Sequence, residues 1–97
     1  SFLDAKTVLI TGANQGIGGG FVKHYLHQGY KVYATYRSQE KSEELLKGKG
    51  DNLIPIQIDF EKPTAAAQKI KEVINDEPLD VMILNAGYFS YQAHKLG

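Results

Sequence analysis

Four short runs of apolar residues recur along the chain, and each has the composition of a buried β-strand. They cover residues 6–10, 31–36, 53–59 and 81–84. Compact runs of this kind, rich in β-branched or aromatic residues, are typical of strands that are covered on both faces of a parallel sheet. The third run contains Pro55, which has no N–H to donate to a strand ladder, so we expect this strand at an edge of the sheet.

The segments between these runs have helical spacing. We expect the first helix to end near Gly29, because glycine readily caps the C-termini of helices. A second, strongly charged helix is expected over residues 39–47, with Ser38 as its N-cap. The third is expected to begin at Pro63 and to be stopped by Pro78. The apolar positions predicted to face the sheet are Ile17, Phe21, Tyr25 and Leu26 in the first helix and Ala67, Ile70, Val73 and Ile74 in the third.

The alternation of strands and helices predicts an α/β fold. The order β-α-β-α-β-α-β implies a parallel sheet with right-handed crossovers. In the doubly wound, Rossmann-type form of this sheet the strands lie in the order 3-2-1-4, and a ligand binds at the carboxyl ends of the first and fourth strands. The edge position expected for the third strand agrees with this order. Because no linker or repeat divides the chain, we expect residues 1–97 to form one domain.

Composition narrows the class of protein. The formal net charge is zero, with 11 basic and 11 acidic residues, so the charge indicates neither nucleic acid nor an anionic membrane as a partner. No apolar run approaches the ~20 residues that a membrane-spanning helix needs. The absence of cysteine excludes disulfides and thiolate chemistry and is typical of proteins in a reducing compartment. We therefore expect a cytoplasmic protein.

The strongest functional signal is the segment TGANQGIG, from Thr11 to Gly18. It connects the first strand to the first helix, a context in which a glycine-rich turn binds phosphate. Gly12 permits a sharp turn with positive φ, Gly16 leaves room for a pyrophosphate against the backbone, and Gly18 lets the helix pack closely on the strand. The free N–H groups and the positive end of the helix would then face the anion. The alternative is a glycine-rich turn without a ligand.

The glycine spacing identifies a family. Gly12, Gly16 and Gly18 differ from the common G-x-G-x-x-G pattern and match T-G-x-x-x-G-I-G, the cofactor loop of the short-chain dehydrogenase/reductase superfamily, which this chain resembles. The sequence LNAG at residues 84–87 is similar to the family's N-N-A-G, with Leu in place of the first Asn. The resemblance covers nearly the whole chain and implies a dinucleotide-binding Rossmann fold. Within the superfamily, the TGAN loop and the sequence YATYR resemble the C-factor and sniffer-like carbonyl reductases.

The resemblance implies a cofactor preference. Arg37 ends the second strand, where an acidic residue would bind the ribose of NAD, and no Asp or Glu occurs from residue 30 to 39. An arginine there can make paired hydrogen bonds to a 2′-phosphate, and Ser38 can add another, so we expect NADP(H) to be favoured over NAD(H). The alternative is an arginine that only contacts solvent. Relatives use an Asp at the position of Asp59 to hold the adenine amino group, near the backbone of Phe60. Asp59 is equally suited to capping a turn.

The LNAG sequence has two expected roles. Asn85 should tie neighbouring strands together by bonds from its side chain to the backbone, and Ala86 and Gly87 should line the cofactor. The predicted cofactor-binding residues are Gly12, Asn14, Gln15, Gly16, Ile17, Gly18, Arg37, Ser38, Asp59, Phe60, Asn85, Ala86 and Gly87.

No metal site is predicted. His24 and His27 lie three residues apart on the first helix, but no carboxylate or cysteine completes a recognisable ligand set with them or with His94. We expect surface or partly packed histidines.

The catalytic residues of the family are not expected in this chain. Family members transfer a proton through a Tyr-x-x-x-Lys pair, in which the lysine lowers the pKa of the tyrosine, with a serine upstream. Tyr91 and Lys95 have this spacing, but they follow Gly87 closely, whereas the family's pair lies much further along the chain. Ser90 is adjacent to Tyr91 rather than suitably upstream. We interpret the spacing as coincidental and assign no catalytic residue.

The resemblance therefore implies the N-terminal, cofactor-binding part of a longer oxidoreductase, with a sheet that is incomplete relative to the family and without the catalytic half. In the parent, hydride would pass between the nicotinamide cofactor and a small carbonyl or alcohol substrate. The alternative is a nonenzymatic nucleotide-sensing or oligomerisation module that keeps the cofactor fold. The apolar strand at residues 81–84 would be an open outer edge, so we expect association, including homo-oligomers.

Overall fold

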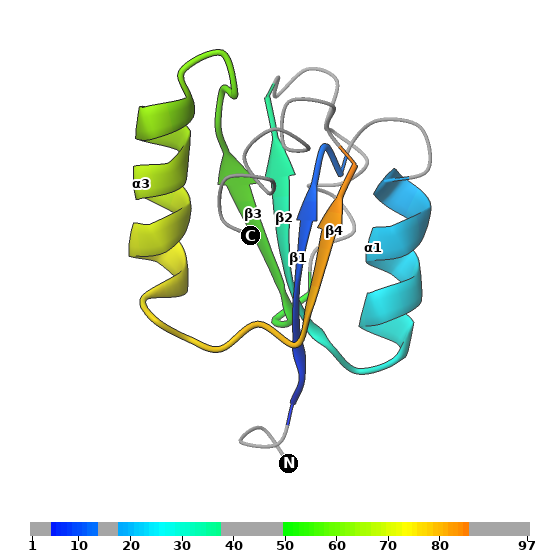
Figure 1. The fold of residues 1–97 in the computed structure, drawn as a ribbon. Coiled ribbons are helices and arrows are strands. Elements are labelled where there is room, and N and C mark those ends of the chain that lie inside the picture. The colour runs from blue at the N-terminus through cyan, green and yellow to red at the C-terminus, as the bar shows by residue number, and fades with distance from the viewer. Residues whose placement is uncertain (1–4, 14–17, 38–49, 86–97) are drawn as a thin grey trace.

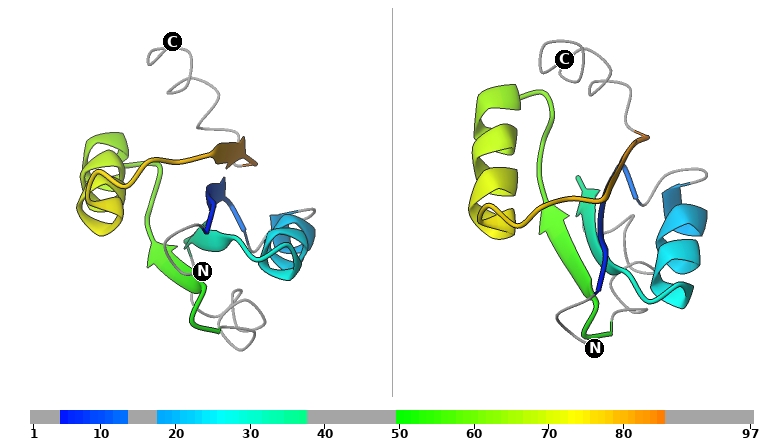
Figure 2. Two further views of the ribbon diagram at one scale, coloured as in Figure 1. Left: turned by 90° about the horizontal axis from the view of Figure 1, so that it is seen from below. Right: turned by 60° about the horizontal axis from the view of Figure 1, so that its bottom comes forward.

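A four-stranded parallel sheet forms the centre of the protein, and the helices α1 and α3 lie on its opposite faces (Figures 1 and 2). The computed structural model describes residues 5–13, 18–37 and 50–85. The elements of this part, in chain order, are β1 (Thr7–Thr11), α1 (Gly18–His27), β2 (Lys31–Tyr36), β3 (Leu53–Gln57), α3 (Pro63–Ile74) and β4 (Val81–Leu84).

The strand order is β3-β2-β1-β4, and every neighbouring pair is parallel. This confirms the predicted α/β fold class and the order 3-2-1-4. Pro55 lies in β3, an edge strand, as its missing N–H required. The strand itself ends at Gln57, two residues before the predicted end. Because Thr11 pairs with Leu84 and Tyr36 with Gln57, the carboxyl ends of all four strands meet at one edge of the sheet.

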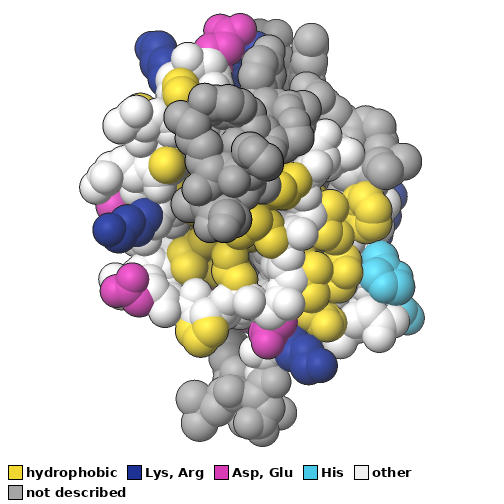
Figure 3. Space-filling model, viewed as in Figure 1, with side chains coloured by type: hydrophobic (Ala, Val, Ile, Leu, Met, Phe, Trp, Pro, Cys, Tyr) yellow, Lys and Arg dark blue, Asp and Glu magenta, His cyan; other side chains and the backbone are white. Residues whose placement is uncertain are grey.

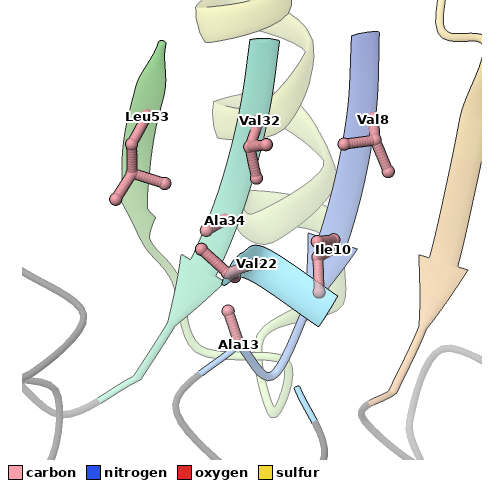
Figure 4. Close-up of a cluster of buried hydrophobic side chains, with 7 residues drawn as sticks. All are labelled: Val8, Ile10, Ala13, Val22, Val32, Ala34 and Leu53. Carbon is pink, nitrogen blue, oxygen red and sulfur yellow. The ribbon is translucent and has the colours of Figure 1, made fainter. Parts of the chain in front are cut away.

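Side chains from β1 and β2 alternate between two cores, as the pleat of a strand requires. Val8 and Ile10 point toward α1, whereas Leu9 lies in the core beneath α3. Burial on both faces explains why these strands read as continuous apolar runs. The buried cluster on the α1 side, drawn in Figure 4, consists of Val8, Ile10, Ala13, Val22, Val32, Ala34 and Leu53. The cluster on the α3 side consists of Leu9, Tyr33, Ile56, Ile58 and Ala66.

The C-terminus of α1 is closed by a Schellman motif. The N–H of Tyr30 donates to the carbonyl of Tyr25 at 3.0 Å, and the N–H of Gly29 donates to the carbonyl of Leu26 at 3.0 Å. Gly29 has φ of +85°, which confirms its predicted role as the cap. The rings of Tyr25 and Tyr30 pack edge to face with centroids 4.8 Å apart, the apolar contact that accompanies this motif.

The buried side of α1 was only partly predicted. Phe21, Tyr25 and Leu26 pack against the core and are half-buried, but Val22, which the spacing did not single out, is the buried side chain of this helix. Ile17 lies outside the described residues.

The predicted end of α3 was wrong. The helix stops at Ile74, where Asn75 takes a left-handed conformation with φ of 52° and donates its N–H to the carbonyl of Lys71 at 2.9 Å. Asparagine tolerates this conformation better than most residues, so the cap precedes Pro78 and the proline is not the stop. The start at Pro63 is confirmed.

The predicted apolar stripe of α3 was partly wrong. Ala66, Ile70 and Ile74 face the core at intervals of four residues, whereas Ala67 and Val73 are exposed. Two β-branched residues in succession, Val73 and Ile74, do not reveal which of them faces the sheet.

Strand β4 forms the other edge of the sheet. Val81 and Ile83 pack partly on the core, while the Met82 side chain is 45% exposed. The space-filling view shows apolar side chains gathered on this face of the molecule (Figure 3).

The predicted helix at residues 39–47 lies outside the described residues. Neither helix in the described part of the chain has the length and hydropathy needed to cross a membrane.

Candidate functional site

The turn after β1 is held by polar groups of the neighbouring strand. Gly12 has φ of +62°, so the chain leaves the sheet here, as the sequence predicted. The Gly12 N–H donates to the Oγ1 of Thr35 at 3.1 Å, and the Ala13 N–H donates to the Thr35 carbonyl at 2.9 Å. Thr35 is fully buried at the end of β2. Sequence reasoning missed this residue, because a threonine in a strand looks like an ordinary β-former.

Gly18 starts α1 in direct contact with this turn. A Cβ atom on Gly18 would lie 2.4 Å from the Gly12 carbonyl oxygen, 2.8 Å from the Asn85 Nδ2 and 3.0 Å from the Ala13 Cα. No side chain fits there without a shift of the backbone. The predicted close packing of helix on strand is therefore confirmed. By contrast, a Cβ on Gly20 would meet no atom of the described residues within 4 Å.

Asn85, directly after β4, binds both the end of β1 and the turn that follows it. Its Nδ2 donates to the Gly12 carbonyl at 3.0 Å, and its backbone N–H donates to the Oγ1 of Thr11 at 3.0 Å. The predicted structural role of Asn85, a bond from its side chain to a neighbouring backbone, is confirmed. Both backbone polar groups of Gly12, its N–H and its carbonyl, are thus bound by side chains, from Thr35 in β2 and from Asn85 directly after β4. The N-terminus of α1, which contacts this turn, is fixed above the carboxyl edge of the sheet.

Arg37 lies at the same edge, directly after β2, with its side chain 58% exposed. Its Nη2 is 3.3 Å from the Glu61 Oε2, and its Nε is 3.8 Å from the Asp59 Oδ1. The backbone carbonyl of Arg37 accepts a hydrogen bond from the Gln57 Nε2 at 3.2 Å. No Asp or Glu occurs from residue 30 to 39 of the sequence, but the structure places the carboxylates of Asp59 and Glu61 beside Arg37. The carboxylates come from the connection after β3, which pairs with β2 in parallel.

Asp59 and Phe60 belong to this connection. The Asp59 Oδ1 accepts the N–H of Glu61 at 3.0 Å, and the Asp59 carbonyl accepts the N–H of Lys62 at 3.0 Å. This confirms the turn-capping interpretation of Asp59. Phe60 is half-buried and packs against the core beneath α3. Asp59, Phe60 and Arg37 thus lie along the carboxyl edge, at the ends of β2 and β3, and Gly12 and Asn85 lie at the ends of β1 and β4.

The remaining predicted residues lie outside the described part of the chain. They are Asn14, Gln15, Gly16, Ile17, Ser38, Ala86 and Gly87, together with Ser90, Tyr91, His94 and Lys95. His24 and His27 are exposed on α1, as expected for surface histidines. Within residues 5–13, 18–37 and 50–85, no three His, Cys, Asp or Glu side chains form a group able to hold a metal ion.

A second polar cluster lies at the opposite, amino edge of the sheet, and sequence reasoning did not find it. Glu77 accepts hydrogen bonds from the Tyr33 hydroxyl and, at 3.0 Å, from the Lys31 Nζ. These two bonds, the one from Tyr33 foremost, lower the pKa of Glu77. Burial, followed by the bond to Glu77, raises the pKa of Tyr33. The cluster ties the segment before β4 to β2, so its role is structural.

Similarity to known proteins extends over nearly the whole chain. The sequence pattern of the family described as short chain dehydrogenase matches residues 6–96. The chain is 38% identical over 92 residues to estradiol 17-beta-dehydrogenase 2 of Mus musculus, a match that covers 90% of this chain and 24% of that protein. It is 38% identical over 85 residues to the NADP-dependent 3-hydroxy acid dehydrogenase YdfG of Escherichia coli K12, covering 82% of this chain and 33% of that protein.

Solved structures agree with the fold. A Caenorhabditis elegans protein assigned as the carbonyl reductase Sniffer superimposes with a TM-score of 0.71 at 28% identity, over 87% of this chain and 38% of that one. The chain spans about a quarter of the mouse relative and about a third of the bacterial one.

Proposed function

The chain belongs to the short-chain dehydrogenase family, and from this premise we propose that it forms the cofactor-binding part of an NADP(H)-dependent oxidoreductase. The observation that carries the proposal is the contact between Gly12, Gly18 and Asn85. This contact leaves no space for a Cβ at Gly18, the first residue of α1, and it fixes the N-terminal end of that helix above the sheet. A helix N-terminus in this position offers free N–H groups and a positive dipole end to a pyrophosphate.

The remaining donors at this edge suit the rest of a dinucleotide. We assign Arg37 to the 2′-phosphate, because a guanidinium makes paired hydrogen bonds with phosphate oxygens. Asp59 and the neighbouring backbone would hold the adenine end, and the segment after Asn85 the nicotinamide end. The full set of residues assigned to the cofactor is Gly12, Asn14, Gln15, Gly16, Ile17, Gly18, Arg37, Ser38, Asp59, Phe60, Asn85, Ala86 and Gly87.

The cofactor, when bound, supplies a hydride donor or acceptor for a carbonyl or alcohol substrate. The residues at the carboxyl edge of the sheet would orient the cofactor by binding its phosphates. We place the groups that transfer the proton outside residues 1–97, and we assign no catalytic residue to this chain.

Fluorescence titration with NADPH and with NADH tests the proposal. The titration uses the intact protein, meaning the longer oxidoreductase that we propose contains this chain. We expect NADPH to bind more tightly, and Arg37→Gln to weaken NADPH about tenfold or more, because a hydrogen bond to a charged group contributes roughly 1.5–3 kcal/mol. The loss for NADH should be much smaller. Lys71→Gln is the control, since this lysine is exposed in the last turn of α3. If Arg37→Gln reduced the affinity for both cofactors equally, the preference for NADP(H) would be rejected. Binding of the cofactor without turnover of any carbonyl or alcohol would favour a nucleotide-sensing module.

A further inference from the structure

The guanidinium of Arg37 is already engaged by carboxylates at the place where a 2′-phosphate would arrive. We propose that Glu61 is a specificity-determining residue, which competes for Arg37 and so reduces the preference for the 2′-phosphorylated cofactor. This inference rests on the proposed function, because it takes Arg37 as the group that binds the 2′-phosphate.

The geometry of the competition follows from the parallel pairing of β2 and β3. Tyr36 lies opposite Gln57, so the residues that follow the two strands emerge side by side. Glu61 reaches the Nη2 of Arg37 at 3.3 Å, and the Nε faces Asp59 at 3.8 Å. A phosphate is best bound by two guanidinium N–H groups acting as a fork. In this structure two of the guanidinium nitrogens are directed at carboxylates instead.

Glu61 and Asp59 differ in how firmly they are held. The Asp59 Oδ1 also accepts the backbone N–H of Glu61 at 3.0 Å, which fixes the Asp59 carboxylate within its turn. The side chain of Glu61 is 55% exposed and reaches Arg37 from the surface. An ion pair this exposed is weak and is readily exchanged. The ion pair between Glu61 and Arg37 can therefore break when a phosphate binds Arg37. The negative charge of Glu61 nevertheless stays close to the bound phosphate.

The two cofactors respond differently to this charge. A 2′-phosphate is an anion, so a nearby carboxylate opposes its binding. A 2′-hydroxyl carries no charge and can donate a hydrogen bond to a carboxylate, as it does to the acidic residue of NAD-binding sites. Arg37 and Glu61 together thus form a site that binds both cofactors with a narrower preference than Arg37 alone would give.

Titration of Glu61→Gln in the intact protein, with NADPH and NADH as the probes, tests the inference. The substitution keeps the shape of the side chain and removes its charge. We expect NADPH to bind about three- to tenfold more tightly, the scale of an exposed charge contact with a multiply charged group, and NADH to bind equally or more weakly. The gain should shrink at high ionic strength. It should also be smaller when Arg37 is replaced by Gln, because competition for the guanidinium is then absent and only the direct repulsion between Glu61 and the phosphate remains.

Glu72→Gln is the matched control. It removes the same charge from an exposed position on α3, where the Glu72 Oε1 accepts a hydrogen bond from the Gln68 Nε2 at 3.4 Å. A gain of equal size in Glu72→Gln would mean that net charge, not the pair with Arg37, is responsible, and the inference would be wrong.

The two proposals fail in different ways. If Arg37→Gln selectively weakens NADPH while Glu61→Gln leaves the ratio of affinities unchanged, the cofactor assignment stands and the role of Glu61 is refuted. If Arg37→Gln changes both cofactors equally, the assignment of Arg37 fails and the inference about Glu61 falls with it.

Discussion

The first turn of α1 contains three consecutive glycines, and the structure predicts opposite effects of alanine at two of them. At Gly18 a new Cβ would lie 2.4 Å from the Gly12 carbonyl oxygen and 2.8 Å from the Asn85 Nδ2. At Gly20 it would meet nothing within 4 Å among the described residues. Gly18→Ala should therefore destabilise the protein, and Gly20→Ala should stabilise it.

The magnitudes follow from known terms. Overpacking costs about 1–3 kcal/mol, and loss of the bond between Asn85 and the Gly12 carbonyl costs about 0.5–1.5 kcal/mol. The helix propensity of alanine returns up to about 1 kcal/mol. With the alanine term at its full value, Gly18→Ala should thus lower the free energy of unfolding by about 0.5–3.5 kcal/mol. Only the favourable term applies at Gly20, so Gly20→Ala should raise the free energy of unfolding by about 0.5–1 kcal/mol.

Urea unfolding of the intact protein, followed by circular dichroism, measures both effects. Repeating Gly18→Ala in an Asn85→Ala background removes the amide from the contact, so the loss should become smaller while the contact with the Gly12 carbonyl remains. If Gly18→Ala were as stable as Gly20→Ala, the close approach of helix and strand would not exist as described, and the main support for the cofactor site would be lost.

The other predictions concern the amino edge and the open edge of the sheet. Because the pKa of Glu77 is lowered from its ordinary value of 4.5, chiefly by the Tyr33 hydroxyl, its stabilising contribution should be present above pH 4.5 and disappear as the pH falls through the lowered value. The difference in unfolding free energy between the wild type and Glu77→Gln should therefore shrink in acid, and a difference that does not depend on pH would refute this. Separately, the isolated 97-residue chain should associate through β4, because this strand lies at an edge of the sheet in the described part of the chain and its exposed Met82 favours pairing with another strand. Light scattering should detect this association, and a monomer with a cooperative thermal transition would contradict it.

The parts of the structure that the sequence predicted are those encoded in local residue types. A positive φ at Gly12 and a missing Cβ at Gly18 follow from the residues themselves. The edge position of Pro55 follows from its missing N–H. Burial on both faces follows from runs of apolar residues without polar alternation, because parallel strands are covered on both sides. These constraints do not depend on knowing which other residue lies nearby.

The parts that the sequence did not predict depend on contacts between distant residues. Nothing near Arg37 in the sequence indicates Glu61, because the two meet only through the pairing of β2 with β3. Thr35 and Glu77 were missed for the same reason, since their hydrogen-bond partners belong to other elements. The end of α3 was misplaced because Asn75 can take a left-handed conformation but is not obliged to, and only the tertiary structure decides.

The two ends of the candidate site differ in how far binding can change without affecting stability. At Gly12 the backbone has left the β ladder, and the side chains of Thr35 and Asn85 take the place of strand partners for its N–H and carbonyl. The same bonds tie the turn to β2 and to the residue after β4 and position the helix N-terminus. If the proposed function is right, a change there should alter folding and anion binding at once. At Arg37 the contacts are exposed ion pairs, which contribute little to stability. Under the two proposals, cofactor preference should therefore change through Glu61 while the fold and the glycine-rich turn stay intact.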